Sequence, residues 1–163
     1  MKIYGIVGWK DAGKTSLMER LVAEFTARGL SVSTLKHAHH AFDIDQPGKD
    51  SYRHREAGAR EVLVAGGARW ALMSELRGEE EPPLTNLLAR LTPVDLVLIE
   101  GWKRDPHPKI EAWRAETGHG LLAATEKTVR ALAVKGEVET ALPCFDLDDT
   151  KALADFVRAE LEL

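Results

Sequence analysis

The sequence predicts an α/β fold: a mostly parallel sheet with helices on both faces and an added β-hairpin. Short apolar segments rich in β-branched residues alternate with segments whose apolar residues recur at helical spacing, which is typical of sheets covered by helices. A strand is expected at 2–7, a helix at 16–28 and a second strand at 30–35. This succession implies parallel strands joined by a right-handed crossover.

The junction between the first strand and the first helix carries the pattern G-x-x-x-x-G-K-T at 8–15. Gly8 and Gly13 permit backbone angles that a Cβ would forbid, so the loop can wrap an anion with its N–H groups. The N-terminus of the following helix adds its positive end. Lys14 is expected to reach the β- and γ-phosphates of a nucleotide, and Thr15 is expected to ligate Mg²⁺.

This motif, placed between a strand and a helix, predicts the three-layer P-loop NTPase fold. The alternative for the motif itself is an ordinary glycine turn. The residues predicted to bind the nucleotide here are Gly8, Trp9, Lys10, Asp11, Ala12, Gly13, Lys14, Thr15 and Ser16.

An apolar strand with an acidic end is expected at 93–101. In a P-loop protein this pattern is typical of the Walker B position, whose carboxylate holds Mg²⁺ directly or through water. Glu100 is the candidate, with Thr15 as the other metal ligand, and Gly101 is expected to bring a backbone N–H to the γ-phosphate. Because many buried strands end in an acid, this assignment depends on the P-loop.

The polar segment 36–51 follows the second predicted strand, at the sheet edge where ligands bind in open α/β folds. Asp43, Asp45 and Asp50 are candidates for the surroundings of Mg²⁺ or for positioning the attacking water. Asp50 has an equal alternative as the N-cap of a short helix at 51–57.

Three histidines of the same segment suggest a transition metal, since imidazole suits zinc, nickel or copper. They are His37, His39 and His40. Their spacing matches no standard zinc site, so a polar loop beside the phosphates is the simpler interpretation.

Two glycines, Gly66 and Gly67, join the apolar segments 61–65 and 68–73. This pattern is typical of a β-hairpin, expected as an insertion at about 61–76 that adds an antiparallel element to the sheet. An apolar hairpin also favours a homodimer, because exposed sheet edges tend to pair.

The composition predicts one domain over residues 1–163, with neither nucleic acid nor a membrane as a partner. The chain has 163 residues, 44% of them hydrophobic, which is enough for one core. No apolar run reaches the length of a membrane span, no signal peptide precedes the first strand, and the net charge is −4 with mixed signs. The single cysteine, Cys144, fits a reducing compartment, so a cytoplasmic location is expected, and a small core residue is its simplest role.

Beyond the Walker B strand lies a basic stretch that contains Lys103, Arg104 and Lys109. Contact with an anionic ligand, such as a pterin phosphate, and a solvated basic loop are two equally open interpretations. Further strands are expected at 109–114 and 129–134, and a last helix capped by Asp148 or Asp149.

Several segments together resemble one known family, the B protein of molybdopterin-guanine dinucleotide biosynthesis. They are residues 8–16, His37, 43–58 with Gly-Lys-Asp-Ser inside it, 69–72, Glu-Gly-Trp-Lys at 100–103, and 108–111. The P-loop is shared with a very large class, whereas the Gly-Lys-Asp-Ser and Glu-Gly-Trp-Lys segments are more specific. The resemblance covers nearly the whole chain. It implies a P-loop fold, GTP and Mg²⁺ binding, slow GTP hydrolysis, a dimer, and an adapter role for the guanylyltransferase of the molybdenum cofactor, which attaches GMP to molybdopterin.

The resemblance assigns a metal or catalytic role to Thr15 and Glu100 and extends to Asp45 and Asp50. With Lys14, the predicted catalytic residues are Lys14, Glu100, Asp45 and Asp50. Dimeric relatives carry a signature lysine at the second motif position, where this chain has Trp9. No Asn-Lys-x-Asp guanine motif is present, so guanine specificity rests on the resemblance alone.

Two other functions stay open at this point. A small-molecule kinase using ATP would share the P-loop, although no arginine-rich lid is evident in the sequence. A metal-delivery GTPase would use the three histidines. Binding of molybdopterin itself to this chain is also left open.

Overall fold

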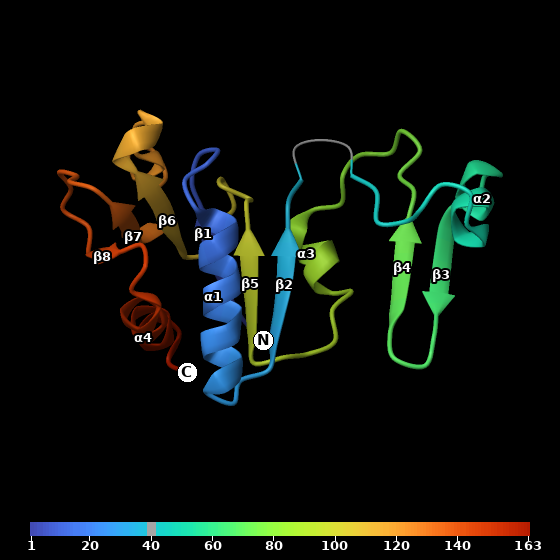
Figure 1. Ribbon diagram of the computed structural model, residues 1–163, viewed down its shortest axis with the longest axis horizontal. Coiled ribbons are helices and arrows are strands. Elements are labelled where there is room, and N and C mark those ends of the chain that lie inside the picture. Colours follow the sequence, from blue (N-terminus) through green and yellow to red (C-terminus); the bar gives the residue numbers. More distant parts are fainter. Residues whose placement is uncertain (39–41) are drawn as a thin grey trace. The chain divides into compact units, whose positions relative to one another are not determined.

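The computed structural model describes residues 1–38 and 42–163 (Figure 1). The chain divides into two compact units, one formed by 1–37 with 91–163 and the other by 38–90. Each unit has its own secondary structure.

The first unit is built on a six-stranded sheet in the order β2-β5-β1-β6-β7-β8. Every neighbouring pair is parallel, as the sequence predicts. β5 lies between β1 and β2, so the crossover through the first helix spans one strand. The strands are β1 (Lys2–Val7), β2 (Val32–Lys36), β5 (Leu96–Glu100), β6 (Lys109–Arg114), β7 (Val129–Lys135) and β8 (Cys144–Asp146).

The register of the three strands β2, β5 and β1 aligns their carboxyl ends. Glu100, the last residue of β5, lies opposite Ile6 of β1 on one side and Lys36 of β2 on the other. All five residues of β5 are buried, which explains why this strand reads as a continuous apolar run. The segment that follows β1 therefore starts next to the carboxylate of Glu100.

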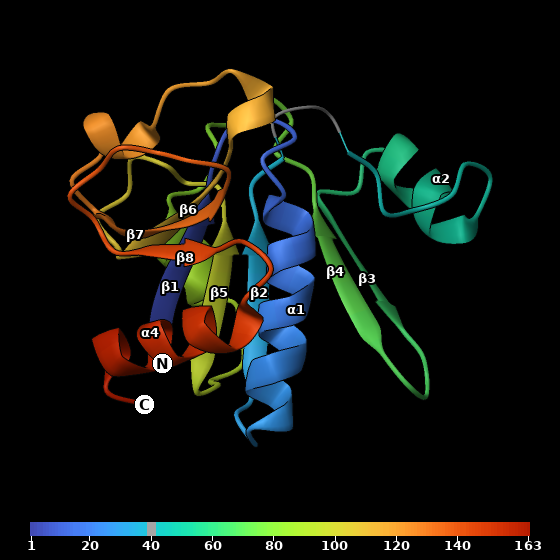
Figure 2. The same cartoon turned by 60° about the vertical axis from the view of Figure 1, so that its left-hand side comes forward.

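Two long helices, α1 (Lys14–Ala27) and α4 (Thr150–Leu161), pack on the same face of this sheet (Figure 2). Leu17, Leu21 and Phe25 of α1 are fully buried, and α4 buries Leu153 and Val157 in the same apolar cluster. Asp149 caps α4 by accepting a 3.1 Å hydrogen bond from the Ala152 N–H. Of the two predicted N-caps, Asp148 and Asp149, the second is therefore the one observed.

The opposite face of the sheet carries a smaller apolar cluster that contains Val7 and Leu132. Leu122, from the 3-10 helix Leu122–Ala124, completes it. A second 3-10 helix is Ala115–Thr117. The predicted α/β fold class is confirmed, with the two long helices together on one face and a 3-10 helix on the other.

The second unit contains α2 (Asp50–Glu56), α3 (Leu84–Leu88) and an antiparallel hairpin, β3 (Glu61–Ala65) with β4 (Trp70–Ser74). The hairpin is confirmed at its predicted place, with Gly66 donating to the Arg69 carbonyl at 2.9 Å. The expectation that it extends the parallel sheet is wrong, because β3 and β4 form a separate two-stranded sheet.

Cys144 is exposed at the start of β8, so the expectation of a core cysteine is wrong: a three-residue edge strand leaves its first side chain in solvent. Within the described part of the chain, no helix has both the length and the apolar character needed to span a membrane.

Candidate functional site

The loop between β1 and α1 has the backbone geometry of an anion cradle. Gly8 (φ 150°) and Gly13 (φ 92°) adopt positive φ values, and so does Asp11 (φ 62°). A Cβ at position 8 would lie 2.4 Å from the Ala112 carbonyl oxygen of β6. The loop therefore lies against the sheet at a distance that only glycine allows.

Helix α1 begins at this loop with free donors. Its N-cap is Gly13, which offers no side-chain acceptor. The first hydrogen bond of the helix runs from the Leu17 N–H to the Gly13 carbonyl, at 3.0 Å. The N–H groups of residues 14–16 precede it and have no intrahelical acceptor. Thr15 and Ser16 are exposed, so these donors face solvent where an anion can reach them.

Lys14 bends back over the loop. Its Nζ donates a 2.7 Å hydrogen bond to the carbonyl oxygen of Trp9. Burial lowers the pKa of Lys14, while the charge of Glu100 opposes this shift. The ammonium group is thus close to both the loop backbone and the carboxylate at the end of β5.

Glu100 lies at the centre of the site. The residue is 8% exposed, and its Oε1 accepts a 3.4 Å hydrogen bond from the Thr15 hydroxyl. The same oxygen is 3.5 Å from Nζ of Lys36. The structure thus brings together Lys14, Thr15 and Glu100, three residues that the sequence placed in one site, and adds Lys36.

Gly101 turns the chain away from the sheet directly after Glu100. It has φ 98°, and its N–H donates to the Ile6 carbonyl at 3.2 Å. A Cβ here would lie 2.9 Å from the Cβ of His37. Since the N–H is engaged with β1, the predicted contact with a γ-phosphate would require it to leave this hydrogen bond.

Trp9, at the second motif position, is tied to a distant segment. Its indole Nε1 donates a 2.8 Å hydrogen bond to the Gly120 carbonyl, and its ring lies 5.5 Å from that of His119. The ammonium of Lys103 sits 4.3 Å from the centre of the indole. Sequence reasoning missed Lys36 as a member of this site, although its position at the carboxyl end of β2 was an available signal. Lys103 was named only as a candidate contact for an anionic ligand, and its contact with Trp9 was not foreseen.

The structure separates the three cations of the basic stretch. Lys109 is fully buried and donates to the Asp105 carbonyl at 2.6 Å and to Thr128 Oγ1 at 2.8 Å. Its ammonium group is therefore bonded to acceptors inside the protein. The expectation that Lys109 contacts an anionic ligand is wrong, because the residue is not accessible to one. Arg104 is exposed, whereas Lys103 is half-buried against Trp9.

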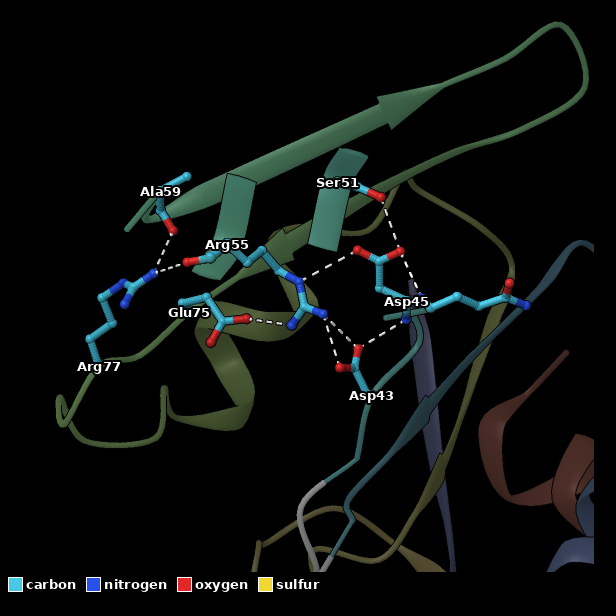
Figure 3. Close-up of polar contacts among 8 residues, drawn as sticks. Asp43, Asp45, Ser51, Arg55, Ala59, Glu75 and Arg77 are labelled. Atoms are coloured by element: carbon cyan, nitrogen blue, oxygen red, sulfur yellow. Dashed lines mark hydrogen bonds and ion pairs between the residues drawn. The ribbon is translucent and has the colours of Figure 1, made fainter. Parts of the chain in front are cut away.

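Asp45 belongs to a polar network of the second unit, drawn in Figure 3. Its Oδ1 accepts hydrogen bonds from Ser51 Oγ at 3.0 Å and from the Gln46 N–H at 2.9 Å. Its Oδ2 lies 3.6 Å from Nε of Arg55. The roles predicted for Asp45 near Mg²⁺ or water stay predictions.

Arg55 is the centre of that network. Its guanidinium also bonds both carboxylate oxygens of Asp43 at 2.9 Å and Oε1 of Glu75 at 2.8 Å (Figure 3). The hydrogen bond from the Asp45 N–H, followed by this pairing with Arg55, lowers the pKa of Asp43. The network joins the segment after residue 42 to α2 and to the end of β4.

Asp50 is the first residue of α2, and the N-cap is Lys49. The capping alternative for Asp50 is therefore wrong, since its backbone is already helical. An acidic side chain in the first turn still favours the positive end of a helix. The catalytic alternative for Asp50 stays a prediction.

Of the three histidines, His39 and His40 lie outside the described residues. The His37 ring packs on Trp102, with 4.9 Å between ring centres. Among residues 1–38 and 42–163, no group of three or more His, Cys, Asp or Glu side chains is placed to hold a metal ion. The metal-delivery hypothesis thus gains no support from the residues that the structure describes.

The donors of the first site fit a nucleotide with Mg²⁺. A carboxylate and a hydroxyl, here Glu100 and Thr15, are oxygen ligands of the kind that Mg²⁺ takes. Their mutual contact is long, at 3.4 Å, so neither oxygen is committed to a strong partner. The loop N–H groups and Lys14 supply the positive side that phosphates need.

Comparison with known proteins identifies the relatives of this chain. The family described as "Molybdopterin guanine dinucleotide synthesis protein B" matches residues 3–135. The chain is 38% identical over 158 residues to a "Molybdopterin-guanine dinucleotide biosynthesis adapter protein" of Escherichia coli, covering 95% of this chain and 90% of that protein. A protein of the same name from Haemophilus influenzae is also 38% identical, with 95% and 86% coverage.

Solved structures agree with this assignment. The crystal structure of Bacillus subtilis MobB is 29% identical, with a TM-score of 0.76 and coverage of 99% of this chain and 98% of that one. A MobB protein homolog from Bacillus stearothermophilus is 28% identical, with a TM-score of 0.71 and 99% coverage of both chains. The resemblance seen in the sequence motifs is confirmed.

Proposed function

Because the chain belongs to the family of molybdopterin guanine dinucleotide synthesis protein B, we propose that it is a GTP-binding adapter in the biosynthesis of molybdopterin-guanine dinucleotide. Its partner is the guanylyltransferase that attaches GMP to molybdopterin. The observation that carries nucleotide binding is the convergence of Lys14, Thr15 and Glu100 at the start of α1.

Each group at the site has a defined task in this proposal. The N–H groups of the loop and of residues 14–16 bind phosphate oxygens. Lys14 exchanges the Trp9 carbonyl for the β- and γ-phosphates. Thr15 and Glu100 hold Mg²⁺, which supplies positive charge to the phosphates when bound. Asp45 and Asp50 are retained as candidates for orienting water, and hydrolysis of GTP is weak.

A homodimer is part of the proposal, and the hairpin of the second unit supports it. Leu63 lies opposite Leu72, and Ala65 opposite Trp70. Residues opposite and two apart share a sheet face, so these four side chains form one apolar face. Leu63 is 60% and Trp70 64% exposed, which is typical of a surface that a partner covers. A cytoplasmic location is proposed from the biosynthetic role.

Titration calorimetry tests nucleotide binding. The protein is titrated with GTP and with ATP in MgCl₂, and the titrations are repeated with Lys14→Ala and with Lys151→Ala as a control. Lys151 is an exposed lysine in the first turn of α4. GTP-selective binding that Lys14→Ala weakens by about 100-fold or more, while Lys151→Ala does not, supports the proposal.

Two results would contradict this assignment. Absence of guanine-nucleotide binding at millimolar concentration, with Mg²⁺ present, would remove the GTP-binding adapter. A preference for ATP would instead favour the kinase alternative, which a screen for phosphate transfer to metabolites would then test.

A further inference from the structure

Trp9 holds two lysines at the mouth of the P-loop. Its backbone carbonyl accepts the 2.7 Å hydrogen bond from Lys14. Its indole ring carries the ammonium of Lys103, 4.3 Å from the ring centre. Lys103 lies 94 positions after Trp9 in the sequence, and nothing in the P-loop motif requires it. A second cation therefore lies beside the motif lysine in the folded chain.

The backbone after β5 directs Lys103 to this place. Gly101 (φ 98°) and Trp102 (φ 45°) both adopt left-handed conformations. A positive φ is rare for a residue as large as tryptophan, and such a conformation persists only where surrounding contacts enforce it. The contact of the Trp102 ring with His37, at 4.9 Å, is such a contact. The tight turn sends residue 103 back towards the loop that follows β1.

The indole that receives Lys103 is itself fixed from the other side. Its Nε1 donates to the Gly120 carbonyl at 2.8 Å. The segment just beyond Gly120 is held by Glu111, whose buried carboxylate accepts from the N–H groups of Leu122 at 2.8 Å and Ala123 at 2.9 Å. The indole of Trp9 is thus anchored at its Nε1 edge, while its face receives Lys103.

The charges around Lys14 show that the site is rich in cations. The pKa of Lys14 is lowered first by burial and also by the charges of Lys103 and Lys36; Glu100 and Asp11 act in the opposite direction. Two further ammonium groups and two carboxylates thus act on the Lys14 ammonium, so that the positive charges in this region exceed the negative ones by one. Such an excess of positive charge suits a polyphosphate.

We propose that Lys103 is a second phosphate-binding residue of this site, and that it exchanges the Trp9 indole for the γ-phosphate of the bound nucleotide. This inference rests on the proposed function. An ammonium over an aromatic ring is attracted only by the ring quadrupole, whereas a phosphate oxygen carries charge and accepts hydrogen bonds. Lys103 follows the Glu100 end of β5, the side on which Mg²⁺ and the γ-phosphate are expected, so it favours GTP over GDP.

Calorimetry with two nucleotides tests this role. GTPγS and GDP are titrated in MgCl₂ into the native protein, Lys103→Ala, Lys103→Arg and Arg104→Ala. Arg104 is the matched control, because it is the next residue, carries the same charge and is exposed. We expect Lys103→Ala to bind GTPγS about tenfold more weakly and GDP within about twofold of the native value. Lys103→Arg restores most of the affinity, and Arg104→Ala changes neither.

Tryptophan fluorescence supplies a second readout that does not depend on hydrolysis. The Trp9 signal is obtained by comparing the native protein with Trp9→Phe, since Trp70, Trp102 and Trp113 also emit. GTPγS is expected to change the Trp9 emission because Lys103 leaves the indole. GDP produces a smaller change, and in Lys103→Ala the difference between the two nucleotides disappears.

The outcomes separate this inference from the proposed function. If the native protein binds neither nucleotide, both fail together. If binding depends on Lys14 but Lys103→Ala binds GTPγS with native affinity, only the role of Lys103 is overturned. An equal loss of GTPγS and GDP affinity also overturns it, because loss of a purely structural contact between Lys103 and Trp9 would weaken the binding of both nucleotides alike.

Discussion

The Thr15 hydroxyl donates a 3.4 Å hydrogen bond to Oε1 of Glu100, which joins the first turn of α1 to the last residue of β5. The two residues are brought together by the parallel pairing of β1 with β5, in which Ile6 lies opposite Glu100. This contact places an oxygen pair suited to Mg²⁺ at the point where the loop between β1 and α1 ends.

Glu100→Gln is expected to remove the Mg²⁺ dependence of GTP binding. The change keeps the shape of the side chain but removes the charge that would hold the metal and that faces Lys36 at 3.5 Å. In MgCl₂ the affinity for GTP falls by about tenfold, and in EDTA it is unchanged or higher, because a negative group near the phosphates is gone. Calorimetry in both buffers measures this, with the exposed Glu137→Gln as the control. Equal Mg²⁺ dependence in Glu100→Gln and the native protein would exclude Glu100 as a metal-holding residue.

Gly8→Ala is expected to destabilise the protein more than an alanine at another positive-φ glycine. Its Cβ would meet the Ala112 carbonyl at 2.4 Å, whereas at Gly29 (φ 86°) no atom lies within 4 Å of a Cβ. Gly29→Ala should therefore cost only about 1 kcal/mol of backbone strain. Gly8→Ala adds the displacement of β6 or of the loop, for a total of about 3 kcal/mol or more. Urea unfolding of both variants measures the two losses in the free energy of unfolding. Equal losses would contradict the close approach of the loop to β6.

The buried imidazole of His107 is expected to make the protein less stable in mild acid. It is 5% exposed, and burial, followed by the charge of Lys109, lowers its pKa to about 4. The folded protein therefore binds the proton more weakly than the unfolded chain, in which the pKa is about 6.5. Its stabilising contribution is complete above about pH 6.5 and is lost as the pH falls towards 4, by about 3 kcal/mol in total.

The variant His107→Gln isolates this contribution, because glutamine does not titrate. Urea unfolding of both proteins between pH 7 and 4 gives the free energy of unfolding at each pH. The native protein should lose more of it than the variant. Parallel curves for the two proteins would show that His107 is not held neutral by the fold.

The apolar face of the hairpin predicts the effect of a charge on oligomeric state. Trp70→Lys places an ammonium on the face shared by Leu63, Ala65 and Leu72, which opposes burial between two copies. Sedimentation velocity should show a native dimer and a shift of Trp70→Lys towards the monomer, with Kd raised by about 100-fold or more. The control is Arg69→Ala in the adjoining turn. A native monomer, or a dimer unaffected by Trp70→Lys, would contradict this face as the dimer surface.

The sequence predicted much of the site because its parts are local. The strand 2–7, the glycines at 8 and 13 and the following helix form one continuous pattern, and short-range sterics and the free N–H groups of a helix start determine its shape. Glu100 was found for a related reason, since a buried apolar strand with an acidic end stands out in the sequence. The hairpin followed from its paired glycines in the same way.

Contacts between residues far apart in the chain could be seen only in the tertiary structure. Lys36 reaches Glu100 because β2 pairs with β5 in a particular register, and no local pattern encodes which strands become neighbours. Lys103 reaches Trp9 through the left-handed turn at Gly101 and Trp102.

The same distinction holds for the whole chain. The α/β class, the glycine-loop motif and the family could all be read from the sequence, because these depend on contiguous periodicity and motif spacing. Tertiary structure decided that the hairpin is a separate sheet, that Cys144 is exposed, that Lys109 is buried and that two lysines meet on Trp9. The physical reason is that hydrogen-bonded pairing and burial are settled between segments, whereas strand, turn and helix preferences are settled within them.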